Sequence, residues 1–462
     1  MLFFAFFASG HVLLRKRDVR AAIGWIGLIW LVPFVGVVLY LLLGINRIKR
    51  RAVALGIREP RPLLLTPAQD EVRRDESKLS SPSALALRAY MDRVVPRPLL
   101  GGNGVRVLDD GDGAYPAMIA AIDDAKHSVG LSTYIFDSRE AGRAFIDALV
   151  RAHSRGVAVR VLIDAVGSRY SMPSADRFLA RASVPCARFL PVLFSPWFNL
   201  RNHRKILVVD GTIGFTGGLN IREEHVRARA KDRATLDTHF ELRGPVVAQL
   251  TEIFAQDWAF TTRELLTGPG WFPEEIARGG GVLARAIGDG PDADFEALKW
   301  TLLGAVSCAS RSVRIMTPYF LPDPDLATAL NVAAMRGVDV RIVVPERGNL
   351  PVVQWAMWAE FRKVLGNGCR VHLVQPPFDH SKLMVVDDVW TLFGSGNWDP
   401  RSLRINFEIV VEAYDAELAG SVGRRLESRI AAAREITLDD LDTRPIVLRL
   451  RDGAARLFSP YL

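Results

Sequence analysis

Two copies of one spaced set of polar residues stand out in this chain of 462 residues. Each copy reads H-x-K-x4-D-x6-G-[GS]-x-N with identical spacing. The shared positions hold His203, Lys205, Asp210 and Asn220 in the first copy, and His380, Lys382, Asp387 and Asn397 in the second. The chain has nine Lys against 50 Arg. A Lys at both equivalent positions therefore indicates that a compact point charge is required there.

These residue types suit chemistry on a phosphodiester. Ammonium and amide groups can hold the phosphoryl oxygens, one imidazole can attack phosphorus, and the other can protonate the leaving oxygen. We therefore assign catalysis to the His, Lys and Asp of both copies, and phosphate binding to both Lys and both Asn. For Asp210 and Asp387 the alternative is that a carboxylate at a strand end fixes a turn.

A neutral imidazole that acts as a nucleophile needs a hydrogen-bond acceptor on its other nitrogen. Two candidates lie about 30 residues beyond the motif histidines: Asp237 in D-T-H-F-E-L and Glu408 in N-F-E-I-V. Glu241 aligns best with Glu408 and is the rival to Asp237. We expect Asp237 and Glu408 to orient the two imidazoles.

The elements that position these residues follow from the apolar pattern. The run 206–209 predicts a buried strand, and period-two alternation places His203 and Lys205 on one face of it. A helix, strand, helix, strand order occurs twice, about 180 residues apart. The matching stretches are 129–136 with 313–320 and 155–163 with 336–344. This duplication predicts an α/β protein in which two pseudo-twofold-related α/β/α domains pool their motifs at a shared seam.

The expected domain organisation follows from these repeats and from the composition between them. It comprises a membrane anchor at 1–50, a linker at 51–95, a first domain at 96–265 with the first motif, a linker at 266–290, a second domain at 291–445 with the second motif, and a C-terminal tail at 446–462.

The excess positive charge is confined to the N-terminus. The first 51 residues carry eight basic side chains and one acid, which leaves 51 basic and 50 acidic side chains in the rest of the chain. A near-neutral body offers little of the electrostatic attraction that nucleic-acid binding needs, so we expect no nucleic-acid partner. The three cysteines are far apart, which excludes a disulfide framework or structural zinc site and favours a reducing compartment.

The N-terminal basic clusters flank apolar segments. Residues 21–44 contain no charged side chain, and as one helix they would extend about 36 Å, enough for a hydrocarbon core of about 30 Å. Residues 1–14 form a second apolar stretch that is short for a crossing. We expect one or two transmembrane helices, with Pro33 also permitting a kinked or re-entrant segment whose ends lie on one face.

Two aromatic stretches are candidates for lipid contact, with core packing as the alternative for both. One, at 190–200, leads into the first motif, and the other, at 352–364, precedes the second motif.

The repeats resemble the HKD motifs of the phospholipase D superfamily. The apolar N-terminal segments, G-S-G-N-W-D-P-R-S-L-R-I-N-F-E around Asn397, D-T-H with a following G-P-V-V, and the closing R-L-F-S-P-Y-L together look most like bacterial cardiolipin synthases. That resemblance implies reversible phosphatidyl transfer between two phosphatidylglycerol molecules, giving cardiolipin and glycerol through a phosphatidyl-histidine.

The resemblance also implies that no metal and no cofactor takes part, that His203 is the nucleophile, and that His380 is the proton donor. It implies a bacterial inner-membrane protein with a cytoplasmic catalytic body and anionic lipids as partners. The alternatives are a phospholipase D hydrolase, or a phosphatidyltransferase with another donor or acceptor such as phosphatidylethanolamine. A nuclease lacks the basic surface it would need, and an inactive scaffold would be expected to have lost a motif His or Lys.

Overall fold

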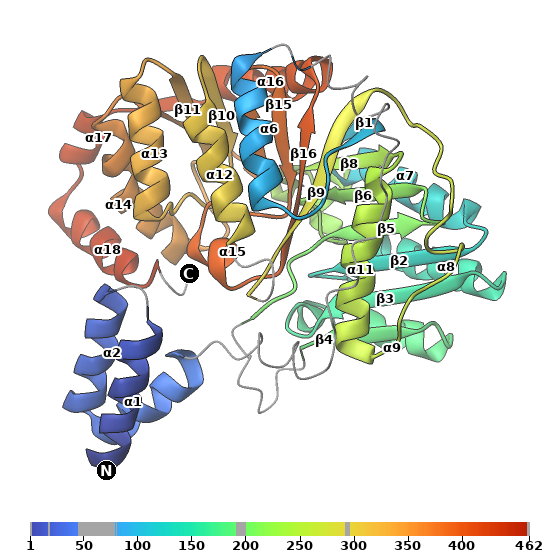
Figure 1. The fold of residues 1–462 in the computed structure, drawn as a ribbon, viewed down its shortest axis with the longest axis horizontal. Helices are drawn as coiled ribbons and strands as arrows, with labels where there is room; N and C mark the ends of the chain where they lie inside the picture. Colours follow the sequence, from blue (N-terminus) through green and yellow to red (C-terminus); the bar gives the residue numbers. More distant parts are fainter. Residues whose placement is uncertain are drawn as a thin grey trace.

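The computed structural model describes residues 2–16, 19–44, 79, 81–190, 200–291 and 296–459. Two α/β halves lie side by side, and a group of N-terminal helices projects from the second half (Figure 1). The halves share one 15-stranded sheet. The two repeated motifs therefore sit in a single structural body.

The strands of the shared sheet come in similar numbers from each half. The first half supplies β1 (Leu100–Asp109), β2 (Ser128–Thr133), β3 (Ala158–Asp164), β4 (Cys186–Phe189), β5 (Ile206–Val209), β6 (Ile213–Gly217) and β8 (Thr238–Arg243). The second supplies β9 (Val282–Asp289), β10 (Ser312–Met316), β11 (Asp339–Pro345), β12 (Arg370–Val374), β14 (Leu383–Val386), β15 (Trp390–Gly394), β16 (Glu408–Tyr414) and β17 (Arg434–Ile436). Two short strands, β7 (Thr235–Leu236) and β13 (Phe378–Asp379), pair in parallel across the halves.

The order of strands shows the pseudo-twofold relation directly. From the centre outward the first half runs β1-β8-β6-β5-β2-β3-β4, and the second runs β9-β16-β15-β14-β10-β11-β12-β17. In both halves the strands nearest the centre are antiparallel, and the next three strands are parallel to one another. These are β2, β3 and β4 in the first half, and β10, β11 and β12 in the second. β1 and β9 pair at the centre, with Leu100 opposite Ala284. The duplicated α/β fold expected from the repeats is confirmed.

Helices cover both faces of the sheet. In the first half these are α7 (Asp110–Asp124), α8 (Glu140–Ser154), α9 (Ala175–Arg181), α10 (Arg227–Ala230) and α11 (Val246–Thr262), with 3-10 turns at Gly167–Tyr170, Glu223–His225 and Lys231–Arg233. The second half has α12 (Ala297–Cys308), α13 (Pro324–Met335), α14 (Pro351–Leu365), α15 (Pro400–Arg404), α16 (Ala416–Ala431), α17 (Leu438–Asp442) and α18 (Ile446–Leu457). α6 (Pro82–Val94) precedes β1 and packs on α12.

Part of the hydrophobic core belongs to both halves at once. One apolar cluster lies within the first half and another within the second, but a third combines residues of α11 and α16 with strands of both. At its centre Phe240 of β8 stacks on Phe393 of β15, with ring centroids 3.8 Å apart and planes 19° from parallel. Both rings are buried. Stacked, desolvated rings of this kind hold the two halves in a fixed relation.

Three intervals that we expected to be linkers or a tail contain regular structure. Residues 282–289 of the expected 266–290 linker form β9, because V-L-A-R-A-I-G-D is an apolar run buried on both faces beside β16 and β1. The expected 446–462 tail begins with α18. Within the expected 51–95 linker, α6 starts at Pro82 with Ser81 as its N-cap, a common helix-start arrangement.

The N-terminal apolar segments form α1 (Leu2–Arg15), α2 (Val19–Leu31), α3 (Pro33–Leu39) and a π-helical turn at Tyr40–Gly44. Of the two forms considered for 21–44, the structure has the segment interrupted at Pro33 and not one continuous helix. Pro33 breaks it, because proline lacks an N–H and clashes with the preceding turn. α3 then folds back on α2 so closely that a Cβ on Gly36 would lie 2.4 Å from the carbonyl oxygen of Leu28.

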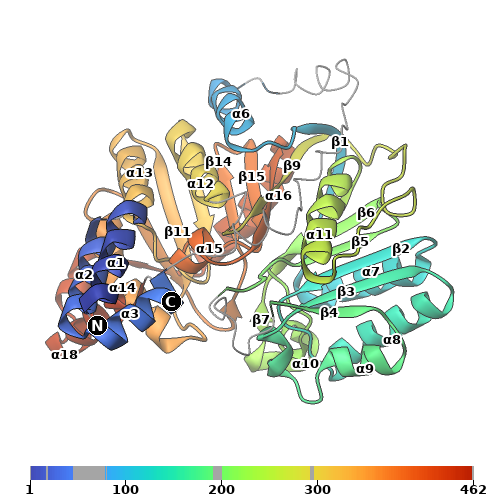
Figure 2. The same cartoon turned by 60° about the horizontal axis from the view of Figure 1, so that its bottom comes forward.

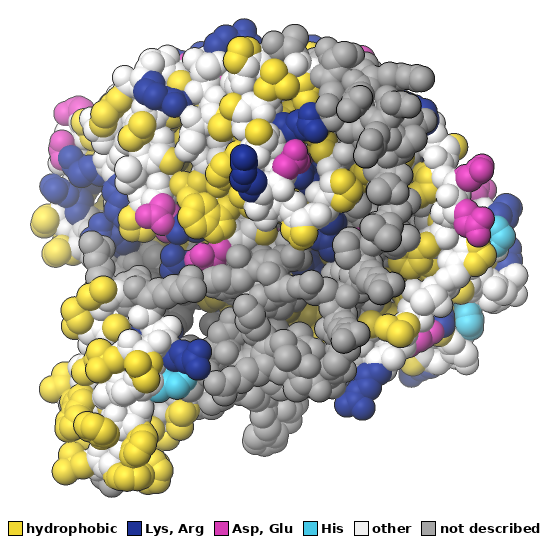
Figure 3. All heavy atoms as spheres, viewed as in Figure 1, with side chains coloured by type: hydrophobic (Ala, Val, Ile, Leu, Met, Phe, Trp, Pro, Cys, Tyr) yellow, Lys and Arg dark blue, Asp and Glu magenta, His cyan; other side chains and the backbone are white. Residues whose placement is uncertain are grey.

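Within the described ranges no helix combines the length and the apolar content that crossing a membrane requires. The N-terminal helices nevertheless expose much apolar surface (Figure 3). The phenyl rings of Phe3, Phe4, Phe6 and Phe7 are all more than half exposed.

Removing either ring of the central stack should destabilise both halves together. Phe240→Ala and Phe393→Ala should each lower the free energy of unfolding by about 3–5 kcal/mol. Denaturant unfolding of both single variants and the double variant should give a coupling energy of about 0.5–1.5 kcal/mol. Phe145, buried in the first-half cluster, provides the control: Phe145→Ala should add to Phe393→Ala without coupling. Additive effects of Phe240→Ala and Phe393→Ala would contradict a shared core.

Candidate active site

The two repeated motifs occupy equivalent positions in the sheet. His203 and Lys205 directly precede β5, and His380 and Lys382 directly precede β14. The backbone N–H of His203 donates to Phe407 in the second half, at 2.9 Å, and that of His380 donates to Leu236 in the first half, at 2.7 Å. The backbone of each motif is thus hydrogen-bonded to the opposite half.

Each imidazole is oriented by a carboxylate from the other half. His203 Nδ1 lies 3.0 Å from Glu408 Oε2, and His380 Nδ1 lies 2.9 Å from Asp237 Oδ2. Glu408 opens β16, and Asp237 directly precedes the symmetry-related β8. The two carboxylates predicted from sequence do contact the histidines, but each one contacts the histidine of the opposite half.

The rival carboxylate, Glu241, has other partners. It accepts hydrogen bonds from Arg106 Nε at 3.0 Å and from Arg243 Nε at 2.8 Å. Both arginines are more than half exposed. Glu241 therefore belongs to a surface ion cluster on β8 and does not orient an imidazole.

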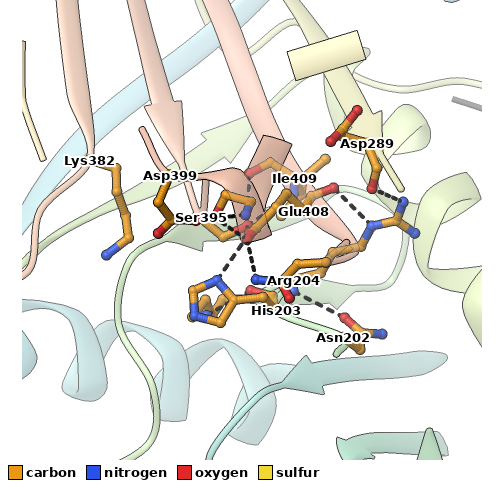
Figure 4. Close-up of polar contacts among 12 residues, drawn as sticks. Asn202, His203, Arg204, Asp289, Lys382, Ser395, Asp399, Glu408 and Ile409 are labelled. Atoms are coloured by element: carbon orange, nitrogen blue, oxygen red, sulfur yellow. Dashed lines mark hydrogen bonds and ion pairs between the residues drawn. The ribbon is translucent and has the colours of Figure 1, made fainter. Parts of the chain in front are cut away.

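A dense set of donors surrounds the Glu408 carboxylate (Figure 4). Oε2 accepts from Ser395 Oγ at 2.5 Å, and Oε1 accepts from Ser402 Oγ at 2.7 Å and Asn406 Nδ2 at 3.2 Å. Burial alone would raise the pKa of Glu408, but His203, Lys205 and Ser395 outweigh it and lower the pKa to about 2. An ionised carboxylate can only accept. His203 must therefore carry its proton on Nδ1, which leaves a lone pair on Nε2.

Asp237 has a different environment. Burial raises its pKa well above the usual range, although Lys382 opposes the shift. Its Oδ1 accepts the backbone N–H of Thr238 at 2.8 Å. Burial also lowers the pKa of His380, so burial favours the uncharged form of both members of this pair.

One position of the shared pattern differs between the copies and contributes to this asymmetry. Gly218 and Ser395 occupy the same motif position. A Cβ at Gly218 would lie 2.3 and 2.4 Å from the two carboxylate oxygens of Asp237, so no side chain fits there. In the second half Ser395 fills the equivalent space and donates to Glu408.

The two motif lysines are buried, and both interact electrostatically with Glu408 and Asp237. Lys205 Nζ donates to the His203 carbonyl at 2.6 Å, and Lys382 Nζ donates to the His380 carbonyl at 2.5 Å. Burial lowers the pKa of Lys205 to about 7 and that of Lys382 to about 8. An ammonium group has three hydrogens, so each lysine keeps donors for a phosphoryl oxygen.

The residue between His and Lys also joins the halves in each copy. Arg204 donates to the Glu408 carbonyl at 2.9 Å and to the Asp289 carbonyl at 3.0 Å, both in the second half. Ser381 Oγ lies 3.1 Å from Thr238 Oγ1 in the first half. Figure 4 shows Arg204 extending away from His203 toward Asp289. These contacts fix the backbone that carries the imidazoles.

The motif asparagines are buried, one in each half. Asn220 Oδ1 accepts the backbone N–H of Ile135 at 3.2 Å, which turns its amide nitrogen away from that contact. The Oδ1 of Asn397 is buried and has no hydrogen-bond partner among the described residues. Their predicted role in holding phosphoryl oxygens stays a prediction.

The structure places the motif aspartates at the far ends of their strands, where they take the turn-fixing role that was the alternative to direct catalysis. Asp210 follows β5, four residues or about 13 Å of strand beyond the Lys205 end. Its carboxylate accepts the backbone N–H groups of Lys126, His127 and Ser128 at 2.7–2.9 Å. Asp387 does the same for residues 310–312. Both aspartates adopt left-handed backbone conformations, with φ of 51° and 53°. They fix the starts of β2 and β10.

Sequence analysis missed the aromatic side chains beside the imidazoles. The ring of Tyr134 lies 5.3 Å from that of His203, and the ring of Tyr319 lies 6.2 Å from that of His380. Both tyrosines lie in the repeated stretches that revealed the duplication, so the signal was present. Of the expected lipid-contacting stretches, residues 191–199 lie outside the described residues. In the part of the chain that the structure describes, no cluster of three or more His, Cys, Asp or Glu side chains could hold a metal ion.

Replacing Glu408 should release the imidazole of His203. Glu408→Gln removes the ionised acceptor, and His203 should lose its fixed Nδ1-protonated tautomer, because a neutral amide can either donate or accept. Nitrogen NMR of histidine-labelled protein at neutral pH would report the tautomer. Glu241→Gln, on the same sheet but bonded only to surface arginines, should leave the His203 signal unchanged. A perturbation by Glu241→Gln alone would refute the crossed pairing.

The chain has clear relatives among known proteins. The family model described as cardiolipin synthase, PLD-like domain, matches residues 118–258 and 302–430, and one described as phospholipase D-nuclease N-terminal matches residues 3–44. Cardiolipin synthase A of Pseudomonas entomophila is 35% identical, covering 98% of this chain and 95% of that protein. Cardiolipin synthase 1 of Bacillus cereus is 30% identical, covering 98% of this chain and 91% of that protein.

Among solved structures, phosphatidylserine synthase of Haemophilus influenzae superposes with a TM-score of 0.63 at 16% identity, covering 81% of this chain and 100% of that chain. At this identity the likeness concerns the fold alone. The family model and the full-length relatives confirm the resemblance found in the motifs, and the chain belongs to the cardiolipin synthase family of the phospholipase D superfamily.

Proposed function

We propose that this protein is a cardiolipin synthase that transfers a phosphatidyl group from one phosphatidylglycerol to another and releases glycerol. The observation that carries the proposal is the pooling of two imidazoles, each with its own carboxylate, and two buried lysines at one seam. Such a site can hold one phosphodiester between a nucleophile and a proton donor. The full-length similarity to cardiolipin synthases supports the choice of lipid.

In the first step His203 Nε2 attacks the phosphorus of the donor lipid. A P–N bond forms, the P–O bond to the glycerol headgroup breaks, and His380 gives a proton to the departing glycerol oxygen. Lys205 and Lys382 balance the charge on the nonbridging oxygens, and the two motif asparagines supply further donors. Glu408 stabilises the imidazolium that His203 becomes.

In the second step a second phosphatidylglycerol occupies the position that glycerol left. His380 takes the proton from its headgroup hydroxyl, the new P–O bond forms, and the P–N bond to His203 breaks. Cardiolipin is released, and both histidines return to their starting states. Water must be kept from the phosphatidyl-histidine, because it would give phosphatidic acid instead.

The different carboxylate environments support this division of roles. Glu408 is ionised and presents His203 with a free Nε2 lone pair, as a nucleophile requires. His380 is neutral in the empty site, and an anionic phosphodiester beside it would raise the pKa of His380 and so favour the protonated donor. A lower pKa for Glu408 than for Asp237 supports the assignment of His203 as nucleophile and His380 as proton donor.

We propose that the N-terminal helices hold the enzyme at the bacterial inner membrane, with the catalytic body on the cytoplasmic side. Their exposed phenyl rings support this, as does the basic cluster at residues 47–51, because juxtamembrane Lys and Arg attract anionic headgroups. The interruption at Pro33 supports the kinked or re-entrant form of the second apolar segment.

The reaction can be tested by product analysis. Purified protein supplied with phosphatidylglycerol alone should form cardiolipin and glycerol in equal amounts. His203→Ala and His380→Ala should each lower the rate by on the order of a thousandfold or more. His127→Ala, which alters an exposed histidine, should leave the rate unchanged. Phosphatidic acid as the main product would show that the protein is a hydrolase.

The pKa values of the two motif lysines predict that kcat/KM falls on the alkaline side of the pH profile. Lys205 and Lys382, with pKa values of about 7 and about 8 in the empty site, lose their charge as the pH rises through this range, so kcat/KM should fall there. Bound phosphodiester would raise both pKa values, so kcat should fall only at higher pH. In Lys205→Arg the fall should follow Lys382 alone. A kcat/KM that stays level from pH 6 to 10 would contradict the assignment.

A further inference from the structure

The C-terminal helix α18 presents an apolar face to the outside of the protein. Ile446, Val447, Leu450, Leu457 and the following Phe458 are each 60–75% exposed. At about 100° per residue these five side chains lie within an arc of about 120°. A surface helix of a globular protein normally turns such an arc toward the core. Here the arc points away from it.

The opposite face of α18 is fixed to the body. Asp452 is buried and accepts from both Arg444 and Arg451 at 2.7 Å. The Arg444 guanidinium lies 3.9 Å from the ring centre of Trp358, and that of Arg451 lies 4.7 Å from Trp355, both on α14. The exposed arc is therefore the outer face of a firmly packed helix. The same contacts cover two tryptophans that we considered for lipid contact, and for these core packing is the explanation.

Arginines border the apolar arc on one side. Arg449 and Arg456 are exposed and lie next to one edge of the arc at helical spacing. An apolar stripe with guanidinium groups along its edge has the composition of a helix that lies in the interface of an anionic bilayer. Long arginine side chains can extend from such a helix to the phosphates.

The neighbourhood of α18 has the same character. Figures 1 and 2 both place α18 beside the N-terminal helices, at the same end of the molecule. Those helices expose Phe3, Phe4, Phe6 and Phe7. Two separate parts of the chain, its first and its last described helices, thus present apolar surface at one end.

We propose that α18 lies in the plane of an anionic phospholipid bilayer, with its 446–458 arc among the acyl chains and Arg449 and Arg456 at the phosphates. It is a second attachment, distinct from the N-terminal helices, and it sets the orientation of the catalytic body on the membrane. The identity of the anionic lipid rests on the proposed function, but the attachment follows from the helix itself.

The test compares two exposed sites in the full-length protein. Leu450 on α18 and Met335 on α13 are both 66% exposed, so Leu450→Cys and Met335→Cys are matched. Each variant is reconstituted into vesicles of phosphatidylglycerol and phosphatidylcholine and treated with a membrane-impermeant maleimide. Peptide-resolved mass spectrometry gives the labelling rate at each site, relative to the denatured protein. We expect the rate at position 450 to be at least threefold below that at position 335.

A smaller difference would overturn the proposal. Protection at position 450 that disappears when the protein is diluted with further lipid of the same composition would also overturn it, because a second copy of the chain would then be the occupant. Cardiolipin formation is measured in the same vesicles. Formation without protection would reject this inference alone, and protection without formation would reject the proposed function alone.

Discussion

The site depends on each half supplying the carboxylate that contacts the histidine of the other half. Two imidazoles and two ammonium groups are buried within one body, and burying such groups is costly unless their hydrogen bonds and charges are completed. Glu408 forms a hydrogen bond with His203 and Asp237 forms one with His380, in each case from the opposite half. Both pairs are already near the middle of the usual hydrogen-bond range of about 2.7–3.2 Å, so they depend on the two halves keeping their relative position. The shared core, the β1–β9 pairing and the contacts of Arg204 are the structural means of keeping that position.

The near-symmetry of the backbone coexists with a chemical asymmetry. Ser395 adds a hydroxyl beside Glu408, and Gly218 leaves room for Asp237 against the strand. His203, Lys205 and Ser395 lower the pKa of Glu408, while burial raises that of Asp237. Equivalent carboxylates thereby differ in pKa, and the Ser395 hydroxyl, which has no counterpart at Gly218, contributes to the difference.

Much of this could be predicted from the sequence, because the information is local or repeated. Identical spacing identified His203, Lys205, His380 and Lys382, and the echo of helix and strand patterns predicted the duplicated fold. The crossing of the carboxylates could not be predicted. Glu408 lies 205 residues from His203, and only the palindromic order of the sheet brings them together.

Other misses have equally physical causes. Period-two alternation does not say whether a motif aspartate continues toward the site or turns back to cap a neighbouring strand, as Asp210 does. A strand buried on both faces, such as β9, lacks the alternation that would distinguish it from a linker with apolar residues. Hydropathy alone counts residues 21–44 as one segment, whereas Pro33 divides it.

The crossed pairing also bears on how such a chain could arise. Either half alone holds a histidine whose orienting carboxylate is in the other half, so a precursor with one motif would have needed a second copy of itself to complete its site. Fusion of two such copies keeps each histidine and its carboxylate in one chain. Each copy can then specialise, one for the nucleophilic histidine and the other for the proton donor. The Gly218 and Ser395 difference is what that freedom allows: a homodimer must carry the same residue at both positions, and a fused pair need not.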